Sequence, residues 1–121
     1  MFSCARQRGV DMPEDFAAIS DTIARVESIL DLRRNEFVPC HNDLYGANIL
    51  QTPQGDVRLV DYDLSGNGDR CYELGFFSTY SDLNAEQVAH LCEDYFGSND
   101  AKIRARVELM GLAADYNSVG L

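Results

Sequence analysis

Two short strand-like runs joined by turn residues lie near the middle of the chain, and they constrain the fold more than any other feature. The runs are Asn48–Gln51 and Val57–Val60, and the segment Thr52–Gly55 between them contains the Pro and Gly that turns favour. Such an arrangement predicts a small β-hairpin. Because a two-stranded hairpin is only marginally stable by itself, the rest of the chain must supply the core.

Helical patterns flank this hairpin and predict a mainly helical α/β fold. We expect helices from Pro13 to near Arg34, over Tyr72–Tyr80, over Ala85–Phe96 and onward from near Asp100. Apolar residues recur at three- and four-residue steps in the first and last of these, at Phe16, Ile19, Ile23, Val26 and Leu30 and at Ile103, Val107, Met110 and Ala114.

Local signals mark several of the element ends. Asn84 followed three residues later by Gln87 is typical of a capping box, and Gly97 suits the end of the same helix. Pro39 within Phe37–His41 indicates an extended stretch or loop. The Gly-, Asn- and Asp-rich segment Asp61–Arg70 is predicted to be a loop.

Length and charge narrow the classes of partner. The 121 residues suffice for one compact domain, and 20 acidic against 10 basic residues give a net charge of -10. That balance argues against nucleic acid or an anionic membrane surface as a partner and permits a cationic substrate. Four cysteines without a Cys-x-x-Cys pair, and two histidines, argue against a zinc site. No apolar stretch approaches a membrane span, so we expect a cytoplasmic protein with reduced thiols.

Polar side chains stand at the ends of the predicted hairpin. A hairpin sets the start of one strand beside the end of its partner, so Asn48 and Asp61 should come together, with Asp43 on the preceding loop. Phosphoryl transfer needs a group that accepts a hydroxyl proton and oxygen ligands for Mg²⁺. We expect Asp43, Asp61 and Asp63 to converge within a few ångström and so to provide such a site.

The spacing of these residues resembles that of a known family. His41-x-Asp43, four residues, Asn48, a hairpin and then Asp61-x-Asp63 is similar to the signature of the choline and ethanolamine kinases, aminoglycoside phosphotransferases and related small-molecule kinases. Protein kinases share the first part of this pattern.

The residues that follow separate the two groups. This chain has no long activation segment and goes directly to Asp69 and to the run Glu73-Leu74-Gly75, which resembles the Asp-Leu-Gly element of the small-molecule kinases.

The resemblance implies a role for each of these positions. Asp43 would be the catalytic base, Asn48 and Asp61 would bind Mg²⁺ and through it the co-substrate ATP, and Asp63 would help at a second metal or substrate site. Structural support would come from His41, Asp69 and Glu73. The acceptor would be a small-molecule alcohol, which can be cationic, with choline or ethanolamine as the first expectation and an aminoglycoside or thiamine as the alternative.

The resemblance covers the C-terminal lobe of a kinase-like fold, residues 1–121 being part of that lobe. No Gly-rich loop precedes Asp43, and the only lysine is Lys102, so the N-terminal nucleotide-binding lobe is expected to be absent. We therefore expect the chain alone to be inactive. A kinase-derived fragment that only binds is the non-enzymatic alternative.

Two other enzyme chemistries have weaker support. Asp61-x-Asp63 after an apolar strand is similar to the first motif of haloacid-dehalogenase-type phosphatases, but that reading leaves Asp43 and Asn48 unexplained. Cys40 beside His41 suggests a nucleophile with its base, yet neighbours in an extended segment point to opposite faces and do not pair easily.

Overall fold

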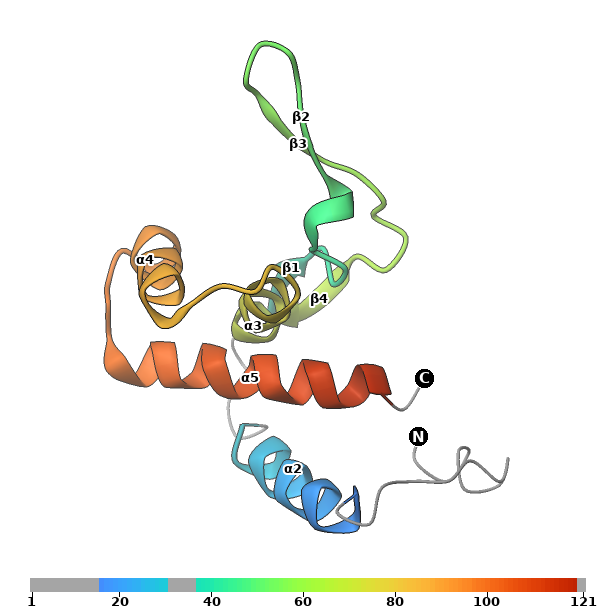
Figure 1. Ribbon diagram of the computed structural model, residues 1–121, viewed down its shortest axis with the longest axis vertical. Helices are drawn as coiled ribbons and strands as arrows, with labels where there is room; N and C mark the ends of the chain where they lie inside the picture. Colours follow the sequence, from blue (N-terminus) through green and yellow to red (C-terminus); the bar gives the residue numbers. More distant parts are fainter. Residues whose placement is uncertain (1–15, 31–36, 120–121) are drawn as a thin grey trace.

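The computed structural model describes residues 16–30 and 37–119, and within them the chain is mainly helical with two small sheets (Figure 1). In chain order the elements are α2 (Phe16–Leu30), β1 (Phe37–Cys40), η2 (Gly46–Asn48), β2 (Ile49–Gln51), β3 (Val57–Leu59), β4 (Gly66–Asp69), α3 (Arg70–Tyr80), α4 (Ala85–Phe96) and α5 (Ala101–Val119). The mainly helical α/β fold with a short hairpin is thereby confirmed. None of the helices in these two ranges is long and apolar enough to cross a membrane.

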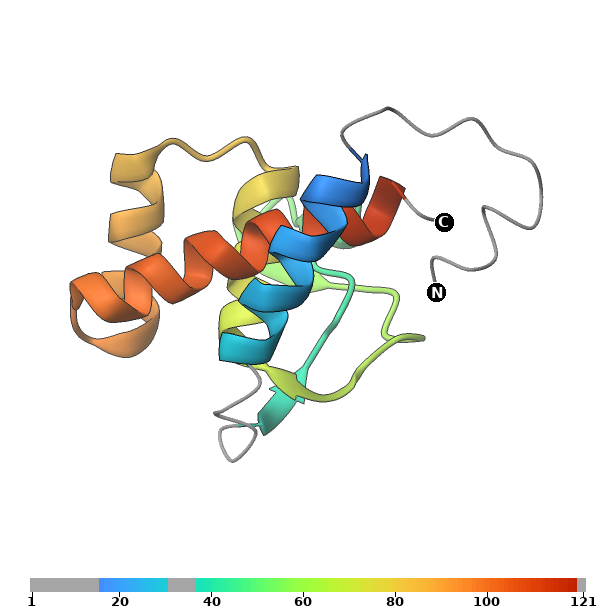
Figure 2. The same ribbon diagram turned by 90° about the horizontal axis from the view of Figure 1, so that it is seen from below.

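Helix α5 is the centre of the helical part, with α2, α3 and α4 arranged around it (Figures 1 and 2). The closest crossing is with α3, where a Cβ on Gly75 would lie 2.5 Å from both the amide nitrogen of Gly111 and the carbonyl oxygen of Val107. These glycines let the two backbones touch. On the other side, the hydroxyls of Ser20 in α2 and Tyr116 in α5 are hydrogen-bonded.

One apolar cluster holds the helices together. Its buried members are Cys71, Leu74, Val88, Cys92, Val107 and Met110. The stripe expected on the last helix is confirmed for Val107, Met110 and Ala114, which are buried. On α2, Val26 packs against the cluster, whereas Ile19 and Ile29 are exposed and the side chains of Phe16, Ile23 and Leu30 lie outside the description.

The ends of α4 confirm the capping signals in the sequence. The side chain of Asn84 accepts hydrogen bonds from the amides of Glu86 and Gln87, and Gln87 Oε1 accepts one from the amide of Asn84. At the other end Gly97 adopts the left-handed conformation with φ 68°. Both ends are therefore set by local chemistry.

The predicted hairpin is present as β2 paired with β3, antiparallel, with Ile49 opposite Leu59. A second two-stranded sheet was not predicted: β1 pairs antiparallel with β4, with Cys40 opposite Gly66. The expected loop Asp61–Arg70 therefore ends in a strand. Gly and Asn have low strand propensity, and the pairing arises from contact with β1 across the chain, which local patterns do not reveal.

Candidate functional site

The predicted base and the first predicted metal ligand are in direct contact. Asn48 is buried at the end of η2, and its side-chain nitrogen donates to the carbonyl oxygen of Asp43 at 2.9 Å and to Asp43 Oδ2 at 3.0 Å. The short 3-10 turn makes this possible because it folds the chain back, with the Asn48 amide donating to the Tyr45 carbonyl at 2.9 Å. Asn48 thus fixes both the backbone and the carboxylate of Asp43.

The hairpin brings Asn48 beside the residue before Asp61. The amide of Val60 donates to the Asn48 carbonyl at 3.0 Å, so the chain leaves the hairpin at this point and continues into Asp61. Asp61 has φ 64°, in the left-handed region. Only a few non-glycine residues adopt that conformation, Asn and Asp among them, and such residues gather at functional sites.

His41 connects the segment before Asp43 to the segment that contains Asp61. It is 5% exposed, its Nε2 is 2.8 Å from the Val60 carbonyl oxygen, and its ring packs on Tyr62 with centroids 4.6 Å apart. The ring therefore contacts the segment on both sides of Asp61, at Val60 and at Tyr62.

Asp69 connects α3 to α5. Its Oδ1 accepts a hydrogen bond from the Cys71 amide at 2.8 Å and so caps α3, while Oδ2 pairs with the Arg106 guanidinium. Because of this cap, α3 begins two residues before the expected Tyr72. Both of these contacts of the Asp69 carboxylate are with helix residues.

Glu73 connects α3 to the loop that contains Asn42 and Asp43. Its Oε2 accepts a hydrogen bond from the backbone amide of Asn42 at 2.8 Å. Asn42 was not among the residues singled out from the sequence, although it is the middle residue of the His-x-Asp motif. Asn42 has a left-handed backbone, with φ 64°. The motif allows any residue at this position, so the motif does not show that a left-handed conformation is required there.

One expectation about the site is wrong. Among residues 16–30 and 37–119, no three His, Cys, Asp or Glu side chains gather closely enough to hold a metal ion. Asp43, Asp61 and Asp63 therefore do not form a three-carboxylate cluster. The hairpin aligns the backbones of Asn48 and Val60, but the left-handed turn at Asp61 then redirects the chain, and both Asp61 and Asp63 are exposed.

The remaining donors still suit Mg²⁺. Both described hydrogen bonds of the Asn48 side chain use its nitrogen, which leaves the amide oxygen as the available ligand atom. Asp61 adds an exposed carboxylate one residue beyond the backbone contact. Mg²⁺ takes oxygen ligands and is commonly bound through one or two protein groups together with substrate phosphates and water. An amide oxygen and a carboxylate fit that requirement without a third protein carboxylate.

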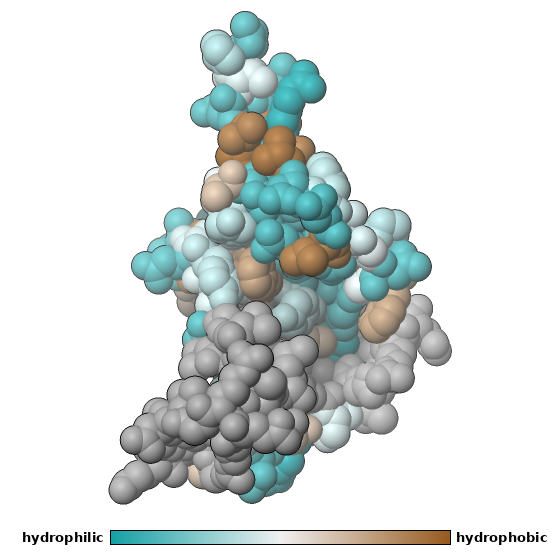
Figure 3. Space-filling model, turned by 90° about the vertical axis from the view of Figure 1, so that its right-hand side faces the viewer, coloured by the Kyte–Doolittle hydropathy of each residue, from teal (hydrophilic) through white to brown (hydrophobic). Residues whose placement is uncertain are grey.

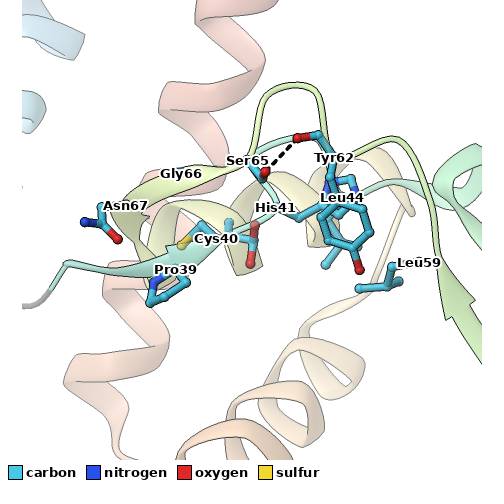
Figure 4. Close-up of a pocket in the computed structure, with 10 residues that line it drawn as sticks. Pro39, Cys40, His41, Leu44, Leu59, Tyr62, Ser65, Gly66 and Asn67 are labelled. Atoms are coloured by element: carbon cyan, nitrogen blue, oxygen red, sulfur yellow. Dashed lines mark hydrogen bonds between the residues drawn. The ribbon is translucent and has the colours of Figure 1, made fainter.

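A cavity of about 490 Å³ lies beside the segment that contains His41 and Leu44 (Figure 4). Its lining includes Cys40, His41, Tyr62, Ser65 and Glu73. Burial raises the pKa of the Cys40 thiol above its usual 9.0, and the negative charge of Glu73 raises that pKa further. The thiol is therefore protonated at neutral pH, which disfavours the nucleophile interpretation of Cys40.

The hairpin carries an exposed apolar surface. Leu50, Val57 and Leu59 are 50%, 65% and 39% exposed. Figure 3 shows hydrophobic side chains gathered on the hairpin below its polar tip, and in Figure 1 the hairpin projects away from the helices. Contiguous exposed apolar area of this kind commonly marks an interaction site.

The sequence of this chain is similar to sequences of known kinases. The choline/ethanolamine kinase family profile matches residues 3–102. The chain is 29% identical over 91 residues to a LicA homolog of Mycoplasma capricolum, covering 75% of this chain and 35% of that protein. It is 34% identical over 58 residues to human ethanolamine kinase 1, covering 47% of this chain and 13% of that protein.

Solved structures agree with these sequence matches. A choline/ethanolamine kinase family protein from Mesorhizobium loti superposes with a TM-score of 0.83 at 27% identity, covering 92% of this chain and 38% of that one. Ethanolamine kinase of Plasmodium vivax has the same fold, with a TM-score of 0.71 at 21% identity, covering 96% of this chain and 38% of that one. The chain spans about a third of the length of these relatives.

Proposed function

Since the chain belongs to the choline/ethanolamine kinase family, we propose that it forms the catalytic part of a kinase that transfers the γ-phosphoryl group of ATP to a small-molecule alcohol. Choline or ethanolamine is the proposed acceptor. The observation that carries the proposal is the pair of hydrogen bonds from the Asn48 side chain to Asp43, next to the strand end that leads into Asp61.

In the proposed reaction Asp43 orients the acceptor hydroxyl and accepts its proton. One bond from Asn48 holds the backbone carbonyl of Asp43, and the other holds Oδ2 of its carboxylate, which leaves Oδ1 outside this pair of bonds. Asn48 Oδ1 and the Asp61 carboxylate are the proposed metal ligands, with Asp63 assisting at a second site. A Mg²⁺ ion held by these residues would supply positive charge to stabilise the charge that develops on the ATP phosphates.

We further propose that these residues form part of a C-terminal lobe, and that a nucleotide-binding lobe must be supplied for turnover. The exposed apolar side of the hairpin supports this, because it offers a surface of the kind that a second lobe would cover. By this proposal, catalytic activity is low or absent in the chain by itself and appears when the second lobe is present.

The proposal is tested with a chimaera in which this chain replaces the matching part of the Mesorhizobium loti relative. ATP-dependent phosphorylation is measured with choline, ethanolamine, thiamine and an aminoglycoside as acceptors, for the chimaera and for the chain alone. We expect choline or ethanolamine to be phosphorylated by the chimaera. If only thiamine or the aminoglycoside is phosphorylated, the proposed acceptor is wrong and that compound takes its place. If a folded chimaera phosphorylates none of the four, the kinase proposal fails and the alternative of a fragment that only binds is favoured.

A further inference from the structure

Asn42 lies at the junction of three segments that the reaction must keep together. Its backbone amide donates to Glu73 Oε2 of α3 at 2.8 Å, and its side-chain nitrogen donates to the carbonyl oxygen of Leu64 at 3.0 Å. A Cβ on Gly68 of β4 would lie 2.9 Å from Asn42 Oδ1, so the β4 backbone packs on this side chain. One residue is therefore held by α3, by β4 and by the loop after Asp61.

The conformation of Asn42 depends on these contacts. Its φ of 64° is unfavourable for most residues and tolerated by Asn. The hydrogen bond to the Glu73 carboxylate is charge-assisted, which makes it stronger than a bond between neutral groups. Because Asn42 directly precedes Asp43, its left-handed turn sets the direction in which the Asp43 loop leaves β1.

We propose that Asn42 is a positioning residue, anchored by Glu73, which holds the Asp43 loop at a fixed spacing from the Asp61–Ser65 loop. The inference rests on the proposed function and adds a residue to it. A displacement of about 1 Å in a reacting group costs up to about 100-fold in rate, so a fixed spacing between the base loop and the metal loop matters for catalysis.

The first test uses no ligand. Amide hydrogen exchange is measured by NMR on the chain as wild type, Glu73→Ala and Glu86→Ala. Glu73 and Glu86 both lie in the first turn of their helices, so the control removes a comparable helix-end charge. We expect the Asn42 amide to exchange about tenfold faster, or more, in Glu73→Ala, as follows from losing a hydrogen bond to a charged group. Equal exchange rates in the two variants would overturn the anchoring role.

The second test measures the spacing with Mn²⁺, whose paramagnetism broadens the signals of nearby amides. In the wild type we expect broadening at both Asp43 and Asp61. Asn42→Gly permits the positive φ but loses the bond to Leu64, so the broadening at Asp43 should weaken relative to that at Asp61. Asn42→Ala, which also strains the backbone, should weaken it further. A wild-type ratio in Asn42→Gly would overturn the bridging role of the side chain.

The two tests separate this inference from the proposed function. If Mn²⁺ broadens neither loop in the wild type, the proposed metal site fails. The exchange rates, together with the shift changes that Asn42→Gly causes over residues 61–65, then decide the positioning role. If those shifts match the wild type, the side chain does not connect the loops and the inference is wrong.

Discussion

Replacing Gly75 with alanine tests how α3 and α5 are held together. The added Cβ would lie 2.5 Å from two backbone atoms of α5, on Val107 and Gly111. A backbone cannot rotate away as a side chain can, so the helices must separate and loosen the cluster that contains Leu74, Val107 and Met110. Overpacking costs about 1 to 3 kcal/mol, and a clash with backbone on both sides belongs at the upper end.

The alanine also has better helix propensity than glycine, which offsets about 1 kcal/mol of that cost. With an overpacking cost of about 3 kcal/mol, the free energy of unfolding is expected to fall by about 2 kcal/mol. With a urea slope of about 2 kcal/mol per molar, the midpoint should fall by about 1 M.

The assay is urea unfolding followed by far-ultraviolet circular dichroism. Gly46→Ala is the matched control, since a Cβ there meets nothing within 4 Å, and its midpoint should stay close to that of the wild type. If Gly75→Ala is as stable as the control, the close α3–α5 crossing is incorrect.

Three further changes test other parts of the structure. Asn84→Ala removes both capping bonds of α4 and should lower the unfolding free energy by about 1 kcal/mol, measured by the same urea titration; no change would mean that the cap is not formed. Burial raises the pKa of the Cys40 thiol above 9.0, so the contribution of the protonated thiol to stability is complete below pH 9 and is lost as the pH rises further. The difference in unfolding free energy between the wild type and Cys40→Ala should therefore shrink above pH 9. A difference that does not change with pH would contradict the burial of this thiol. Calorimetric titration should show weak Mg²⁺ binding that is lost in Asp61→Ala and kept in Asp56→Ala, an exposed control on the hairpin; equal binding in all three would exclude Asp61 as a ligand.

The elements that could be predicted from sequence are those whose signals are local. The α4 helix was predicted with its capping box and its glycine end because each signal acts within one turn of its own helix end. Asn84 and Gln87 act at the start of α4, and Gly97 acts at its end. The β2–β3 hairpin was predicted because both strands and the turn are contiguous in the chain. The core face of α5 followed from helical periodicity.

The features that escaped prediction depend on contacts between distant segments. Strand β4 consists of Gly, Asn, Gly and Asp, and it forms because β1 lies beside it, with Cys40 opposite Gly66, which follows it by 26 residues in the chain. The bond from Asn42 to Glu73 joins residues 31 apart. The expected three-carboxylate cluster failed because residue spacing cannot reveal the left-handed turn at Asp61.

The measurement that tests the central claim most directly is kcat of Asp43→Asn in the chimaera with the completed lobes. Asparagine keeps the size and the hydrogen-bonding shape of Asp43 but cannot accept the proton. We predict that kcat falls by about 10² to 10⁴, the usual contribution of a general base, while the KM for ATP stays close to that of the parent. A variant that keeps near-parental kcat would contradict the assignment of Asp43 as the base, and with it the proposed kinase mechanism.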